Sequence, residues 1–181
     1  MAETHTRNQR LYPQSSLRTE CLAFHRDQVI KGQAYGYLRH PERSSPGYLF
    51  VDPTIASHQV IALWWKGLAL HGIVRLLATT AGQKARDMLE KGCRLGASAR
   101  CWGSVEITRG SGMQTVHNNC RLITFDLTEE PATGLFLQPL TTSPAAELLP
   151  SILSGEHQQS LALQSAITHK EEADGAANEA Y

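Results

Sequence analysis

Apolar and polar residues alternate over short stretches between residues 28 and 127, a pattern that predicts β-strands rather than helices. β-branched and aromatic side chains are dense in two of these stretches, 58–66 and 72–78. A Gly-rich turn at 109–112 separates two further candidates and predicts a hairpin. The strand candidates are residues 34–39, 48–51, 58–66, 72–78, 97–107 and 115–127.

One helix is expected among these strands, at about residues 82–91. Thr79 or Thr80 can cap its first turn, and Gly92 stands where a glycine commonly follows the last turn. The apolar stripe of this helix consists of Ala85, Met88 and Leu89. The spacing of these residues predicts a short amphipathic helix.

This order of elements predicts an all-β fold with one short helix, the five-stranded OB-fold barrel, although other small barrels fit the pattern. We expect an N-terminal extension at 1–27 and the OB-fold domain at 28–127. An acidic C-terminal region at 128–181 follows, with short helical stretches and a disordered tip.

Charge is segregated along the chain although the net charge is zero. Residues 1–125 carry a net charge of +8 and residues 126–181 a net charge of −8. This asymmetry indicates a body that binds a polyanion, followed by an acidic tail; a solvated surface on which the signs cluster is the alternative. The sequence contains neither an apolar run of membrane-spanning length nor a secretory signal, so we expect a cytoplasmic protein.

Aromatic and basic residues are interleaved in the predicted strands. Side chains alternate across a strand, so Ser98, Arg100 and Trp102 share a polar face. Trp64 and Trp65 must point to opposite sides of their strand. Bases stack on flat side chains while cations follow phosphates, so an exposed face of this kind suits single-stranded nucleic acid. The alternative is that the rings fill the barrel or a subunit interface.

These arguments select a set of candidate nucleic-acid-binding residues. They are Tyr35, Tyr37, Arg39, Arg43, Trp64, Trp65, Lys66, Arg75, Arg100, Trp102, Arg109 and Arg121.

Three segments resemble the bacterial single-stranded-DNA-binding protein family. Residues 36–43 (GYLRHPER) are similar to an early turn of that family, with His40 where the family usually has Asp. Residues 72–92 resemble its strand and helix, which end in Leu-Arg-Lys-Gly, and residues 103–106 with 121–125 resemble its last hairpin. The similarity covers about residues 34–127. The longer stretch at 48–70 and the unusual tail indicate a divergent member, carried by a plasmid, phage or integrative element.

The resemblance implies an OB-fold protein that binds single-stranded DNA, or RNA, with little sequence preference, in replication, recombination or transfer of DNA. It also implies a homo-oligomer that recruits replication or recombination proteins through its acidic tail, here through Asp174, Glu179 and Tyr181. The alternative is a protein–protein accessory or inhibitor module of a mobile element, built on the same barrel, that does not bind DNA.

Enzymatic motifs are not found. The sequence has no phosphate-binding loop, no Gly-x-Ser-x-Gly elbow and no His-Glu-x-x-His arrangement. His71 or His117 could serve as a general base in principle, but a lone histidine in a strand is more often structural. The cysteines match no common zinc spacing and suit buried thiols. We therefore expect a protein without catalytic residues, metal or cofactor.

Overall fold

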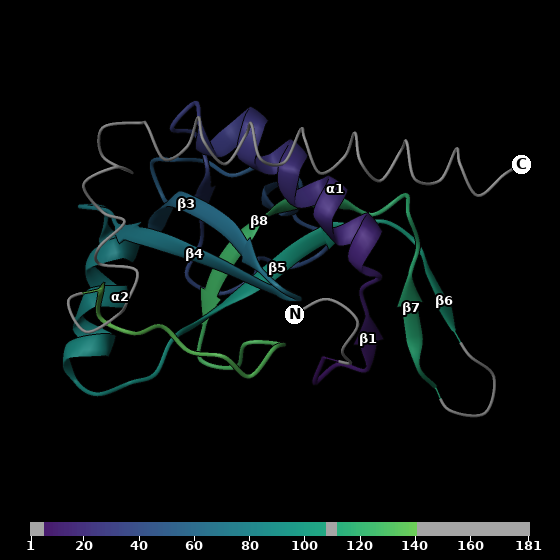
Figure 1. The fold of residues 1–181 in the computed structure, drawn as a ribbon. Helices are drawn as coiled ribbons and strands as arrows, with labels where there is room; N and C mark the ends of the chain where they lie inside the picture. The colour runs from purple at the N-terminus through teal and green to yellow at the C-terminus, as the bar shows by residue number, and fades with distance from the viewer. Residues whose placement is uncertain (1–5, 108–111, 141–181) are drawn as a thin grey trace, which may run out of the picture.

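The computed structural model describes residues 6–107 and 112–140 (Figure 1). These residues form short strands with two α-helices and two irregular helical turns. In chain order the elements are β1 (Arg10–Leu11), α1 (Gln14–Phe24), a π-helical turn (His25–Val29), β2 (Tyr35–Gly36), a 3₁₀ turn (Pro46–Tyr48), β3 (His58–Lys66), β4 (Ala69–Leu76), α2 (Thr80–Glu90), β5 (Gly96–Trp102), β6 (Val105–Ile107), β7 (Gln114–Val116) and β8 (Arg121–Thr128).

The strands form three small sheets, in the orders β1-β7-β6, β2-β3-β4 and β5-β8. The expectation of a mostly β fold with a short helix between strands is confirmed, but the five-stranded OB-fold barrel is not present among the described residues. The strands do not close into a barrel, because in the described residues β5 pairs only with β8. Strand β8 meets the segment that follows β2 only through the isolated Leu38–Leu127 bridge.

Helix α2 follows the predicted pattern closely. The Thr79 hydroxyl accepts a hydrogen bond from the Gly82 N–H at 3.0 Å, which satisfies one of the free donors of the first turn. Gly92 has a φ of +83°, a left-handed conformation that favours glycine after a helix. Neither α-helix of the described chain has the length and apolar run that a bilayer span requires.

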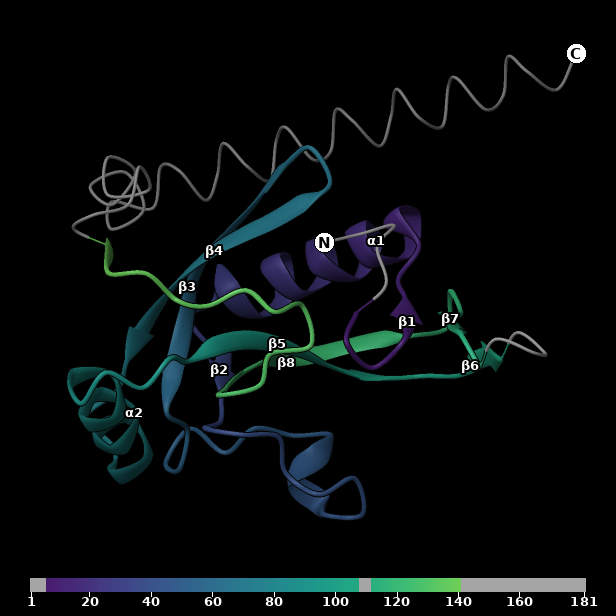
Figure 2. The same cartoon turned by 90° about the horizontal axis from the view of Figure 1, so that it is seen from below.

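Helix α1 lies in the region that was expected to be an extension without clear periodicity. It packs along β8, while α2 lies at the far end of the molecule from β6 and β7 (Figures 1 and 2). Phe24, which is 5% exposed, meets Phe125 edge to face with ring centroids 5.7 Å apart. The Glu20 carboxylate accepts a hydrogen bond from the Leu122 N–H. These contacts hold the helix against β8.

The predicted hairpin of the last strands is confirmed as two ladders, β5 with β8 and β6 with β7. Gly103 lies at the break between them, where a Cβ would be 2.5 Å from the Cα of Cys120. The β5–β8 ladder pairs Ser98 with Asp126. Directly opposed residues of an antiparallel pair project from the same face, so these two side chains are neighbours.

The β3–β4 hairpin places the adjacent tryptophans in different clusters, as the alternation predicted. Trp65 packs against the main core with Val60 and Leu63, and Trp64 packs against Ala62 and Ile73.

Candidate active site

Three polar side chains from distant parts of the chain meet on one face of the β5–β8 ladder. Ser98 lies on β5 and Asp126 lies opposite it on β8. The third side chain, His40, comes from the segment after β2, which runs beside the end of β8.

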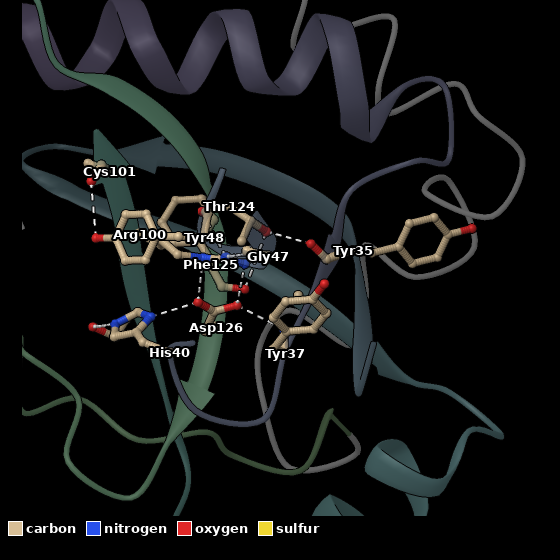
Figure 3. A network of polar contacts seen from close by, with 12 residues as sticks. Tyr35, Tyr37, His40, Gly47, Tyr48, Arg100, Cys101, Thr124, Phe125 and Asp126 are labelled. Atoms are coloured by element: carbon tan, nitrogen blue, oxygen red, sulfur yellow. Dashed lines mark hydrogen bonds and ion pairs between the residues drawn. The ribbon is translucent and has the colours of Figure 1, made fainter. Parts of the chain in front are cut away.

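A sharp turn brings His40 to this face. Arg39 has a φ of 71°, a left-handed conformation that is uncommon for a residue with a Cβ. Its N–H donates a hydrogen bond to the Leu127 carbonyl at 2.6 Å, and the Leu127 N–H donates to the Tyr37 carbonyl at 2.9 Å. These two bonds anchor the segment to β8 on one side of His40. Figure 3 shows the His40 imidazole pointing toward the Asp126 carboxylate.

The three side chains form a continuous hydrogen-bonded line. The distance from Ser98 Oγ to His40 Nε2 is 3.1 Å, and that from His40 Nδ1 to Asp126 Oδ2 is 2.6 Å. An ionised carboxylate only accepts hydrogen bonds, so Nδ1 carries the proton and donates it to Asp126. Nε2 is then free to accept from the Ser98 hydroxyl. This is the geometry in which histidine acts as the general base for a serine nucleophile.

Asp126 is held by further donors and is fully buried. Its Oδ1 accepts from the Tyr37 N–H at 2.8 Å and from Arg100 Nη2 at 3.2 Å, and Arg100 Nε lies 2.8 Å from Oδ2. Ser98 is 4% exposed, whereas the His40 side chain is 38% exposed. The acid is therefore fixed in the interior, and the histidine faces solvent.

A second serine–histidine contact in the core is unsuited to catalysis. His58 Nε2 donates to the Phe125 carbonyl at 3.0 Å, and the Ser57 hydroxyl lies 2.9 Å from its Nδ1. Both residues have no exposed surface, and burial lowers the pKa of His58 to about 4. No substrate can reach this pair in the folded state, so it serves to hold β3 against β8.

The two histidines singled out as possible general bases lie elsewhere. His71 stacks on the Trp64 ring at 5.7 Å in the β3–β4 hairpin, and the backbone N–H of His117 donates to the Ser104 carbonyl. The described residues contain no group of three or more potential ligands placed to hold a metal ion. An apolar cavity of about 200 Å³ is lined by Ala97 and Ala99, which alternate with Ser98 and so belong to the other face of β5.

Comparison with known proteins identifies the family to which this chain belongs. The family model described as prohead core protein serine protease matches residues 1–135. The chain belongs to this family. Its sequence is 32% identical over 123 residues to the prohead core protein protease of Enterobacteria phage T4, an alignment that covers 67% of this chain and 55% of that protein. The chain thus spans about half the length of this curated relative.

A solved structure supports the same family from the fold. The bacteriophage T4 capsid assembly protease gp21 superposes with a TM-score of 0.63 at 30% sequence identity, covering 70% of this chain and 76% of that chain.

These findings overturn several expectations drawn from the sequence. The resemblance to single-stranded-DNA-binding proteins is wrong, and with it the DNA-binding function, the replication and recombination partners and the alternative of a non-enzymatic accessory module. The expectation of a protein that is not an enzyme is wrong for the same reason. The motif that suggested DNA binding was GYLRHPER at residues 36–43. Its one departure from the DNA-binding pattern, His40, is the histidine of this site.

Most of the residues predicted to bind nucleic acid lie in two separate regions, the β3–β4 hairpin and the surroundings of the site. Trp64, Trp65, Lys66 and Arg75 belong to the β3–β4 hairpin, and Arg75 donates to the Gln59 side chain. The Trp65 ring lies under the Arg18 guanidinium, 5.3 Å from it.

A second group surrounds the site itself. Tyr37 is buried and stacks beside Arg100, whose 1% exposure contradicts the expected exposed polar face. Trp102, on the same face, is 47% exposed, and Arg43 lies over its ring. Arg39 forms an ion pair with Glu129.

The remaining candidates fall outside the site. The Tyr35 carbonyl accepts from the Thr124 hydroxyl, and Arg121 begins β8 with an exposed side chain. Arg109 and the proposed tail residues Asp174, Glu179 and Tyr181 lie outside the described residues.

Sequence reasoning missed all three members of the line. Ser98 was placed on the correct face by alternation and Asp126 was placed in the last predicted strand, 115–127, but neither was assigned a role. Two features of the sequence could have indicated the site: Asp126, a charged residue at an inward position of the last predicted strand, and His40, which departs from the resembled motif. Neither feature shows that residues 40, 98 and 126 meet, because that depends on the strand register.

Proposed function

We propose that this protein is a serine endopeptidase of phage capsid assembly, with Ser98 as the nucleophile, His40 as the general base and Asp126 as the acid that orients His40. The observation that carries the proposal is the pair of distances from Ser98 Oγ to His40 Nε2 and from His40 Nδ1 to Asp126 Oδ2, 3.1 Å and 2.6 Å. Membership of a family of prohead core protein serine proteases gives the arrangement its biological setting.

In the proposed reaction, His40 Nε2 takes the proton from the Ser98 hydroxyl as Oγ attacks the scissile carbonyl carbon. The same nitrogen returns that proton to the leaving amine, which leaves an acyl-enzyme on Ser98. Water, deprotonated by His40, then attacks the ester, and His40 passes that proton to Ser98 Oγ as the second product leaves, which regenerates the free hydroxyl. Asp126 keeps Nδ1 protonated and stabilises the imidazolium throughout.

The substrates we propose are protein components of the prohead core, following the name of the curated T4 relative, prohead core protein protease. The chain matches 55% of the T4 protease, so the substrate class rests on this family relationship rather than on the geometry of the site.

Active-site labelling tests the chemistry without knowledge of the substrate. The full chain is incubated with a fluorophosphonate probe, and the modified residue is identified by mass spectrometry. We expect modification of Ser98, its loss in Ser98→Ala, and at least about a thousandfold slower labelling in His40→Ala. Ser104→Ala is the matched control, because Ser104 is an exposed serine near the end of β5 whose hydroxyl donates to the Asn119 side chain. Labelling that is absent, or that persists in Ser98→Ala, would refute the proposal.

Peptide cleavage tests the proteolysis itself. Incubation with a peptide library derived from a digested phage-infected cell lysate should give new termini that depend on Ser98 and not on Ser104. Their absence at enzyme concentrations that label fully would restrict the protein to hydrolysis of non-peptide esters.

A further inference from the structure

Two side chains, the His40 imidazole and the Arg100 guanidinium, approach the same oxygen of the buried carboxylate. Oδ2 of Asp126 lies 2.6 Å from His40 Nδ1 and 2.8 Å from Arg100 Nε. The side chains of Arg100 and Asp126 are both fully buried, so this ion pair is shielded from solvent. An orienting acid that is also paired with a fixed guanidinium carries less net negative charge toward its histidine.

The same guanidinium is tied to the loop between β2 and β3. Arg100 Nη1 donates to the carbonyls of Gly47 and Tyr48 at 2.5 and 2.9 Å. The rings of Tyr37 and Tyr48 lie 5.1 and 5.7 Å from its centre. Figure 3 shows Tyr37 and Tyr48 gathered with Asp126 and Arg100 around this contact. The loop and the acid therefore share one buried cation.

The other ionisable groups of this region do not pair with Asp126: one is ion-paired elsewhere, one is uncharged and one lies over aromatic rings. Arg39, the neighbour of His40 in the chain, pairs with Glu129 beyond the end of β8. The charge of Asp126 raises the pKa of His58 on β3, but burial has the larger effect and lowers this pKa to about 4, so His58 is uncharged near neutral pH. Arg43, from the loop, lies over the rings of Tyr48 and Trp102. Arg100 is thus the cation paired with the carboxylate that His40 uses.

We infer that Arg100 is a positioning residue of the site: it locks Asp126 in place, ties that acid to the 46–48 loop, and opposes protonation of His40. The inference rests on the proposed protease function, because it assigns Arg100 a part in the same reaction. The hydrogen bonds and ion pair described for Arg100 go to Asp126 and to the Gly47 and Tyr48 carbonyls, so it acts on the site through Asp126.

The pH dependence of Ser98 labelling tests this inference, because it would stay unchanged if Arg100 only stabilised the fold. The second-order rate of fluorophosphonate labelling of Ser98 is measured from pH 5 to 9 in the full chain. Arg100→Met removes the positive charge that competes with the imidazolium for Asp126. We expect the half-maximal pH to rise by about one unit or more, because one charge in a buried site has an effect of this size. The maximal rate should fall about tenfold.

Arg100→Lys is the conservative comparison. It keeps the charge but cannot bridge the carboxylate and both loop carbonyls. We expect the half-maximal pH to return to that of the wild type while the maximal rate stays reduced. A folded Arg100→Met protein with the wild-type pH profile and rate would overturn the inference. Wild-type protein without labelling at Ser98 would instead refute the protease proposal itself, so the two failures are distinguishable.

A loop variant keeps the inference testable if Arg100→Met does not fold. Tyr48→Ala removes the ring beside Arg100 and the hydroxyl contact to the Cys101 carbonyl from a surface loop. We expect labelling to slow about tenfold. The control is Phe50→Ala in the same loop, where the side chain is 75% exposed and labelling should be unchanged. Equal rates in the two variants would overturn the connection between the loop and Asp126.

Discussion

Acidification should destabilise this protein through one buried histidine. His58 has no exposed surface and is uncharged in the fold, with its Nε2 donating to the Phe125 carbonyl. Burial lowers its pKa from 6.5 to about 4. Between these two pH values, His58 is protonated in the unfolded chain but mostly not in the folded chain. The free energy of unfolding must therefore fall as the pH falls through this window.

The size of the effect follows from the shift. Each pKa unit corresponds to about 1.4 kcal/mol, so the loss is about 3 kcal/mol when the pH has dropped from 6.5 to 4. This is a large part of the 5–15 kcal/mol that is typical for the unfolding of a domain. Glu129 acts in the same direction at lower pH, because Arg39 lowers its pKa and that stabilisation is lost as the carboxylate becomes protonated.

Urea unfolding at closely spaced pH values isolates the contribution of His58. His58→Gln keeps a side-chain donor for the Phe125 carbonyl but cannot titrate. We expect it to be less stable than wild type at pH 7 and to lose less stability between pH 6.5 and 4. The control His71→Gln, at an exposed hairpin position, should follow the wild-type curve. Parallel curves for wild type and His58→Gln would refute the reasoning.

Three further predictions follow from single contacts. Asp126→Asn cannot accept from both His40 Nδ1 and the Arg100 fork, so labelling of Ser98 should slow by about 10⁴-fold, while Asp87→Asn on α2 should label normally. Phe24→Ala empties the contact between α1 and Phe125 and should lower the free energy of unfolding by about 3–5 kcal/mol in urea titrations; a loss below about 1 kcal/mol would mean that α1 is not held there. Cys93 is exposed and should react with a thiol reagent in the native state at pH 8, whereas Cys21, whose pKa burial raises to about 12, should react only on unfolding; mass spectrometry of the modified peptides gives the order.

Local patterns along the chain were sufficient for much of the secondary structure. The Thr79 cap and Gly92 define α2, and alternation correctly placed Ser98, Arg100 and Trp102 on one face of β5. Helix α1 was missed because Leu17, Cys21 and Phe24 form only a narrow apolar stripe in an otherwise polar segment.

The site could not be predicted from alternation, because a polar face of a strand can be either solvated or buried and paired. Arg100 was assigned to solvent, yet the 46–48 loop covers it and Asp126 neutralises it. The meeting of His40 with Ser98 and Asp126 depends on the left-handed turn at Arg39 and on strand register, which are tertiary properties that no local window of sequence contains.

The pairing of Ser98 with Asp126 has a consequence for the timing of synthesis. A ribosome produces His40 and Ser98 before Asp126, and the three can meet only after β8 has left the exit tunnel and paired with β5. The growing chain therefore has no oriented base while it is incomplete. A slip of one residue in this ladder would send Asp126 to the opposite face, away from His40 and Arg100, and leave the polypeptide inert. The proposed protease activity would therefore require that the last strand of the ladder has been made and aligned correctly.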